Sequence, residues 1–144
     1  LTDSQVESLS HEGVCSIYPP ISPQQVIEEQ NKSDVLVHVE SFSLKNKLEV
    51  RYSISTKIMD YISTGRCVFA IGPSNIASME YLKSNGLALI ANNKDEIINK
   101  INEINSHPEI IDKLANKSLS FAIETLDEKS QRLEFFNDLY NLIK

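Results

Sequence analysis

Short aliphatic runs alternate with helix-like segments along the middle of this 144-residue chain. The runs cover residues 34–40, 67–71 and 87–90, and each is nearly continuous in apolar residues. Such runs are typical of strands that are covered on both faces. Because strands that alternate with helices form βαβ units, the pattern predicts an α/β fold: a Rossmann-like parallel sheet flanked by helices, with right-handed crossovers.

Capping residues and periodicity predict the remaining elements. They are a short helix to about residue 11, a strand over 14–18, a helix over 22–31, a polar loop over 41–53, a helix over 53–65, a helix to about 84 capped by Ser74 or Asn75, and three closing helices at about 94–106, 108–123 and 127–142. At this length we expect one domain, covering 1–144.

The composition limits the classes of function. Apolar residues make up 41% of the chain and charged residues 24%, as in ordinary globular domains. The net charge of −6 argues against a general nucleic-acid or membrane-surface binder, because both functions require a basic face. No apolar run approaches the roughly 20 residues that cross a bilayer, and no signal peptide is visible. Cys15 and Cys67 each fall in an expected buried strand, so we expect reduced core thiols and a cytoplasmic protein.

The helix after residue 53 begins with a group of hydroxyl-bearing side chains. Ser53, Ser55 and Thr56 precede Lys57, and Asp60 follows about one turn after Thr56. A helix N-terminus presents free N–H groups and partial positive charge, so it suits a phosphate. Asp60 then lies where a carboxylate can accept hydrogen bonds from a sugar hydroxyl of the same ligand. Ordinary N-capping and complementation of the helix dipole also explain these residues, and the sequence leaves both interpretations open.

The expected sheet places this turn at the edge where ligands bind. Ligands of parallel sheets lie beyond the carboxyl ends of the strands, and Ser41 directly follows the strand over 34–40. The segment 45–66 carries five Lys or Arg residues against two acids, although the whole chain is acidic. Arg51 is the preferred side-chain partner for a phosphate there, because its planar fork matches phosphate geometry. A solvated mixture of charges is the alternative explanation.

Other catalytic and cofactor motifs are absent from the sequence. It contains no G-x-G-x-x-G, no G-x-x-x-x-G-K-[ST], no Ser-His-Asp or Cys-His grouping and no metal-ligand spacing. His38 lies in the middle of an expected strand, where a packed histidine is favoured over a base. We therefore assign no catalytic residue, no metal and no cofactor.

Three segments carry a resemblance to a known family. They are Ser33-Asp34-Val35-Leu36-Val37 through Ser41, Ser55-Thr56-Lys57-Ile58-Met59-Asp60-Tyr61 through Val68, and Asn85-Gly86-Leu87-Ala88-Leu89-Ile90. Their order and spacing, over about residues 33–91, resemble the C-terminal half of a GT-B glycosyltransferase of the bacterial group-1 family, which builds polysaccharides and other glycans. The closing helices suit the rest of that domain.

The resemblance implies a truncated donor-binding domain of a longer enzyme, and the first residue, Leu1 rather than Met, fits an excised piece. It implies a nucleoside-diphosphate sugar donor, with Ser53, Ser55, Thr56 and Lys57 at the diphosphate. Asp60 falls where the family commonly has a glutamate that holds the ribose. The whole enzyme would transfer a hexose or related sugar, without a bound metal, to a glycan or lipid-linked acceptor. That acceptor would be held by a missing N-terminal half, in some settings at the inner face of the membrane, and the fragment alone is expected to be inactive.

This sequence departs from the family pattern in two ways. The family often has two glutamates separated by seven residues, but counting back from Asp60 gives Tyr52, so the role of the first glutamate is unassigned. The earlier strands of the family's sheet are also absent. Since the strand over 34–40 then lacks a neighbour, we expect it to pair with the strand over 14–18 or, by self-association, with another chain.

Two other functions remain open. One is a non-catalytic flavodoxin-like or receiver-like protein-interaction module. A receiver requires an acidic cluster and a phosphorylatable aspartate that are not evident here, and Pro19-Pro20 occupies the position of a flavin-binding loop. The other is a donor-like domain that has lost catalysis and only scaffolds a complex.

Overall fold

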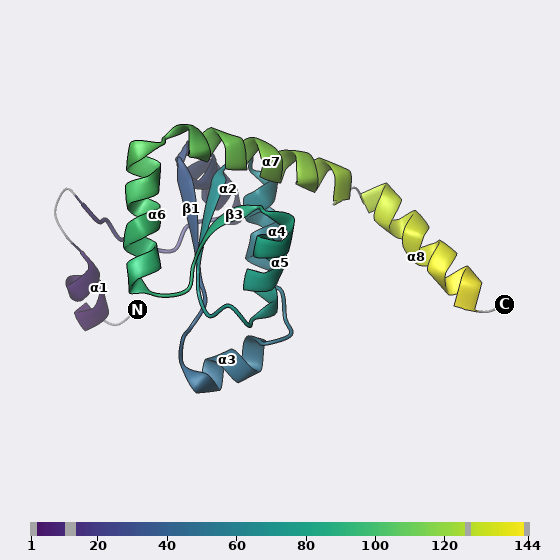
Figure 1. The fold of residues 1–144 in the computed structure, drawn as a ribbon, viewed down its shortest axis with the longest axis horizontal. Coiled ribbons are helices and arrows are strands. Elements are labelled where there is room, and N and C mark those ends of the chain that lie inside the picture. The colour runs from purple at the N-terminus through teal and green to yellow at the C-terminus, as the bar shows by residue number, and fades with distance from the viewer. Residues whose placement is uncertain (1–2, 11–13, 126–127, 143–144) are drawn as a thin grey trace.

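The computed structural model describes residues 3–10, 14–125 and 128–142 (Figure 1). A parallel sheet of three strands lies at its centre, in the order β1–β2–β3. The strands are β1 (Val35–Val39), β2 (Cys67–Ile71) and β3 (Ala88–Ala91). The helices are α1 (Asp3–Leu9), α2 (Pro23–Lys32), α3 (Leu44–Val50), α4 (Thr56–Ser63), α5 (Ala77–Asn85), α6 (Lys94–Ser106), α7 (Glu109–Thr125) and α8 (Glu128–Leu142). The α/β fold with a parallel sheet is confirmed.

Helices cover both faces of the sheet. Ile58 and Ile62 of α4 and Met79 of α5 pack against one face, and all three are buried. Phe69 and Leu89 point to the opposite face, where α6 and the first turns of α7 cover them. Because β2 lies between the two layers, its residues are almost completely buried, as its continuous apolar run predicted. Figure 1 shows α7 running across one end of the sheet and α8 projecting away from the body.

β1 is an edge strand and is buried on one face only. Leu36 and His38 are buried on the face that α4 covers, whereas Val37 and Val39 are 49% and 64% exposed on the other. The two-sided burial expected for this strand is therefore wrong. The reason is that the layer of α6 and α7 covers β2 and β3 and reaches β1 only at Val35, so Val37 and Val39 are left outside it.

The expected strand over 14–18 does not form, and its pairing with β1 is wrong. This segment contains a single bridge position at Cys15, and Cys15 is exposed rather than buried. Among the described strands β1 pairs only with β2. A run of five residues followed by Pro19-Pro20 gains too little burial, without a covering layer, to offset the cost of ordering it. Pairing of β1 with another chain stays a prediction.

Three further boundaries differ from the expectations. The expected loop over 41–53 contains α3, which begins because the Ser43 hydroxyl accepts a hydrogen bond from the N–H of Asn46 at 3.3 Å. Ile76, rather than Ser74 or Asn75, is the N-cap residue of α5. The first helix ends at Leu9, and residues 11–13 lie outside the described part of the chain.

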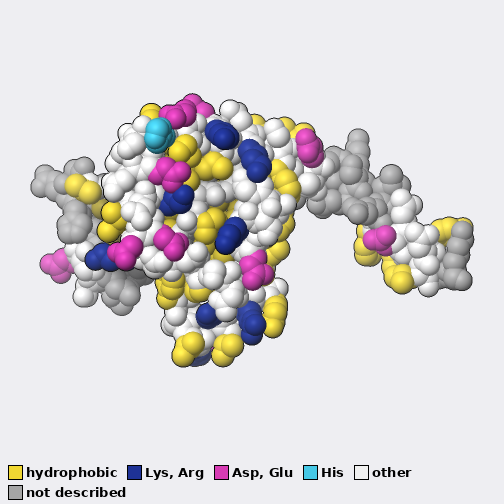
Figure 2. Space-filling view, in the orientation of Figure 1, with side chains coloured by type: hydrophobic (Ala, Val, Ile, Leu, Met, Phe, Trp, Pro, Cys, Tyr) yellow, Lys and Arg dark blue, Asp and Glu magenta, His cyan; other side chains and the backbone are white. Residues whose placement is uncertain are grey.

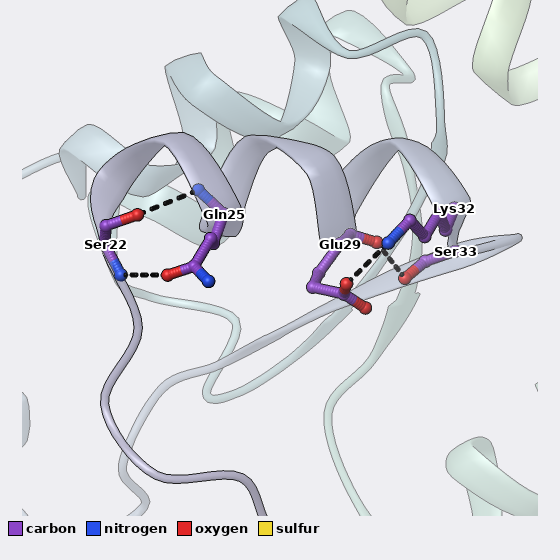
Figure 3. A network of polar contacts seen from close by, with 5 residues as sticks. All are labelled: Ser22, Gln25, Glu29, Lys32 and Ser33. Carbon is purple, nitrogen blue, oxygen red and sulfur yellow. Dashed lines mark hydrogen bonds and ion pairs between the residues drawn. The ribbon is translucent and has the colours of Figure 1, made fainter.

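Local hydrogen bonds hold α2, which has no buried residue of its own. Figure 3 shows the contacts at the start of α2, between Ser22 and Gln25, and those near its end, around Glu29 and Lys32. At its start Ser22 and Gln25 form a capping box, with hydrogen bonds of 3.3 Å and 2.9 Å. Near its end Lys32 Nζ lies 2.8 Å from Glu29 Oε1, and this hydrogen bond and charge raise the pKa of Lys32. The end of α2 is also fixed to the sheet, because the guanidinium of Arg66 donates a hydrogen bond to the carbonyl of Asn31.

Candidate functional site

The start of α4 is not capped by a side chain. Ser55 is the N-cap residue, but its hydroxyl makes no capping hydrogen bond. The first N–H groups of the helix, those of Thr56 and Lys57, have no hydrogen-bond partner among the described residues. By contrast, Ser22 caps α2 and Asn93 caps α6 through their side chains. The simple N-capping interpretation is therefore wrong for Ser55, and two backbone donors at this helix end are free for a ligand.

A buried serine of the next helix fixes the turn that leads into α4. Ser78 Oγ accepts a hydrogen bond from the N–H of Ser55 at 3.1 Å and donates one to the carbonyl of Ser53 at 3.3 Å. The N–H of Ala77 donates to the carbonyl of Arg51 at 2.9 Å. These contacts order the turn from outside, so that its own hydroxyls remain available.

A cavity of about 310 Å³ lies between the end of β1 and the start of α4. Its lining residues are Val37, His38, Val39, Glu40, Val50, Ser53, Ser55, Lys57 and Tyr61. Three of the predicted site residues thus come together here: Ser53, Ser55 and Lys57. Lys57 is exposed, so this lining residue is in contact with solvent. The volume is at the lower end of the range for small-molecule sites.

Two residues that we did not predict for the site form its most buried polar pair. His38 Nε2 lies 3.0 Å from Glu40 Oε1, and the two side chains are 6% and 12% exposed. The N–H of Glu40 continues the sheet by donating to the carbonyl of Ile71 at 2.8 Å. The chain approaches Gly72 so closely that a β-carbon there would lie 2.8 Å from the Cβ of Glu40. His38 is packed, as expected. The sequence contains a signal for this pair: Glu40 follows His38 by two residues, so the two side chains lie on the same face at the carboxyl end of β1.

Asp60 lies on a second, larger cavity. This cavity is about 700 Å³ and lies between α2 and α4, with Asp60, Ile21, Val26, Ile27 and Met59 among its lining residues. Asp60 is exposed and makes no hydrogen bond or ion pair within the described residues. Asp60 and Lys57 therefore line different cavities on either side of α4, rather than one common cradle.

The remaining predicted residues lie close by but line neither cavity. Thr56 is exposed at the start of α4. The guanidinium carbon of Arg51 lies 5.1 Å from the centre of the Tyr52 ring, a cation–π contact. The hydroxyl of Ser41 accepts a hydrogen bond from the N–H of Ser43 at 3.2 Å. Contact of Arg51 or Ser41 with a phosphate stays a prediction.

The charges around the site are mixed in sign. On the face drawn in Figure 2, Lys and Arg side chains lie among Asp and Glu side chains instead of forming one basic patch. The smaller cavity is lined by one residue of each sign, Lys57 and Glu40. Such a site favours a ligand with an anionic part and a separate hydroxyl-bearing part.

The described residues contain neither a candidate metal site nor a candidate membrane span. In residues 3–10, 14–125 and 128–142 there is no group of three or more His, Cys, Asp or Glu side chains placed to hold a metal ion. None of the helices in this part of the chain combines the length and apolar character needed to span a bilayer.

The fold and the site define a small parallel α/β unit with two cavities beside an uncapped helix start. Comparisons with protein-family models, with curated proteins and with solved structures found no match.

Proposed function

We propose that this chain binds a nucleoside-diphosphate sugar, as the donor-binding part of a glycosyltransferase. The observation that carries the proposal is that α4 lines two cavities of different chemistry, the smaller one near its N-terminus and the larger one from Met59 onward. One cavity is large and mainly apolar, with Asp60 at its side, and the other is small and polar, with Lys57 in its lining. A nucleoside-diphosphate sugar contains a nucleoside, a diphosphate and a sugar in that order. We therefore match the nucleoside to the larger cavity, the diphosphate to the start of α4 and the sugar to the smaller cavity.

Each part of such a ligand has a suitable partner. The apolar side chains of the larger cavity suit a base, and Asp60 can accept hydrogen bonds from ribose hydroxyls. The free N–H groups of Thr56 and Lys57, with the Lys57 ammonium, suit the diphosphate. The same groups would stabilise the negative charge that develops on the diphosphate when it leaves.

The rest of the proposed reaction involves parts outside this chain. A glycan or lipid-linked acceptor would be held by another part of a longer protein, which belongs to the cytoplasm or to the inner face of its membrane. The class needs no cofactor other than the donor substrate itself. We assign no catalytic residue in this chain.

Isothermal titration of the 144-residue chain with UDP, ADP and GDP tests this proposal. We expect one of them to bind, and Lys57→Ala to weaken that binding by about 10-fold or more, since a hydrogen bond to a charged group contributes roughly 1.5–3 kcal/mol. Lys113→Ala is the matched control, because Lys113 is exposed on α7 and lines neither cavity. If none of the three binds, or if Lys57→Ala binds as tightly as the unchanged chain, the proposal is wrong.

The uncovered edge of β1 favours a second candidate, a non-catalytic protein-interaction module. An open strand edge with exposed Val37 and Val39 is a template for strand addition by another chain. Light scattering of the purified chain over a range of concentrations checks for self-association. A chain that dimerises and binds no nucleotide would favour this candidate.

A further inference from the structure

We infer that the His38–Glu40 pair recognises the sugar of the donor, with Glu40 as a specificity-determining residue that accepts hydrogen bonds from sugar hydroxyls. This inference rests on the proposed function. It adds the residue that recognises the transferred group. It also adds the chemical class of that group, which is an uncharged sugar with free hydroxyls.

The first step concerns the unused hydrogen-bonding capacity of Glu40. A carboxylate has two oxygens and about four acceptor positions. Oε1 is 3.0 Å from His38 Nε2, whereas Oε2 has no hydrogen-bond partner among the described residues. Oε2 is not among the buried polar atoms that lack a partner, so it faces the open cavity as a free acceptor. A ligand that brings hydroxyl donors into the cavity supplies the missing partners.

The second step concerns the placement of charge in the cavity. Glu40 and His38 are the buried residues of the lining, and Lys57 is exposed, so the negative charge lies on a mostly buried side chain and the positive charge on one in contact with solvent. Phosphate oxygens accept hydrogen bonds and carry negative charge, so Glu40 repels them. Sugar hydroxyls are neutral and donate. The diphosphate therefore stays at Lys57 and the start of α4, and the hydroxyl-bearing part enters the cavity.

The third step concerns the rigidity of Glu40. Its backbone N–H is fixed to Ile71, its Cβ lies against Gly72, and its carboxylate is held by His38. A side chain held on a strand in this way loses little conformational freedom on binding, which favours selective recognition. Because Glu40 carries a negative charge and lies in the cavity, a uronic acid is disfavoured relative to a neutral hexose.

The test separates binding of the sugar from binding of the nucleotide. The unchanged chain is titrated with UDP and UDP-glucose, ADP and ADP-glucose, and GDP and GDP-mannose. The sugar contribution is the Kd of the diphosphate divided by the Kd of its sugar nucleotide. We expect Glu40→Gln to lower this ratio by about 10-fold through a higher Kd of the sugar nucleotide, while Lys57→Ala weakens both ligands. The Kd of the diphosphate does not rise in Glu40→Gln, because the substitution removes a charge that repels phosphate. We also expect UDP-glucuronate to bind more weakly than UDP-glucose.

Matched variants make the outcome interpretable. Glu49→Gln makes the same chemical change on the exposed surface of α3 and is expected to leave both Kd values unchanged. Glu40→Asp keeps the charge but shortens the side chain, and it is expected to lower the sugar contribution even if Glu40→Gln does not fold. The folded state of each variant is checked by its thermal midpoint.

The two proposals fail in different ways. Absence of binding by every diphosphate and sugar nucleotide contradicts the proposed function, and the inference with it. Binding of a diphosphate that depends on Lys57, together with a sugar contribution that neither Glu40 variant changes, contradicts the inference alone. Tighter binding of UDP-glucuronate than of UDP-glucose also contradicts the inference alone.

Discussion

The hydroxyl of Ser78 ties α5 to the turn that opens α4. It accepts a hydrogen bond from the N–H of Ser55 at 3.1 Å, although the two residues are 23 positions apart, and it donates one to the carbonyl of Ser53. Ser78 is fully buried and lines neither of the two cavities beside α4. The geometry of the candidate phosphate site therefore depends on a side chain of a different helix.

Replacing Ser78 tests how much these two hydrogen bonds contribute to the stability of the fold. Ser78→Ala leaves the N–H of Ser55 and the carbonyl of Ser53 without their shared partner, so we expect the free energy of unfolding to fall by about 1–3 kcal/mol. Urea unfolding followed by circular dichroism measures the change. Ser120→Ala is the control, because Ser120 is exposed on α7. Equal stability of the two variants would show that the tie is dispensable.

The end of α5 requires a left-handed residue. Gly86 is the C-cap residue with φ of 62°, and its N–H bonds the carbonyls of Leu82 and Lys83. A residue with a β-carbon in this conformation costs about 1–2 kcal/mol, and asparagine tolerates it better than alanine. We expect Gly86→Ala to lower the thermal midpoint more than Gly86→Asn does. The opposite order would mean that crowding near Lys117, and not backbone strain, decides the cost.

The two cysteines differ in environment and therefore in reactivity. Burial raises the pKa of the Cys67 thiol to about 11, while Cys15 is exposed. Because the thiolate is the reactive form, we expect a chromogenic disulfide reagent at pH 8 to titrate one thiol rapidly and the second only after unfolding. Cys15→Ser should abolish the rapid phase. Rapid reaction of both thiols in the native chain would contradict the burial of Cys67.

The same pKa shift has a consequence for stability. The fold favours the protonated Cys67 thiol, so the contribution of this group is complete below its ordinary pKa of 9.0 and is lost as the pH rises toward about 11. Urea unfolding of the Cys15→Ser chain at pH 8 and at pH 10.5 measures the loss. Cys67→Ala should remove this part of the pH dependence.

The bounds of two elements, β2 and α6, could be predicted correctly from the sequence. In both, the apolar pattern of the segment matches the burial that the structure gives it. β2 lies between two layers of helices, so its apolar run 67–71 matched the observed strand exactly in extent. α6 covers Lys94–Ser106, the same range that we expected, with Asn93 as its N-cap residue and His107 after its end. In α6 the capping residue and the apolar periodicity act locally, and in β2 the continuous apolar run indicates burial on both faces although its partners are distant in sequence.

The sequence by itself determined the α/β class, the three strands of the parallel sheet and the hydroxyl-rich start of α4, because periodicity, capping and turn residues act over a few positions. Only the tertiary structure decided which residues meet. It left Val37 and Val39 of β1 exposed on one face and placed Asp60 and Lys57 in different cavities. These relationships depend on how helices separated by many residues pack against a shared sheet, and no local pattern encodes that packing.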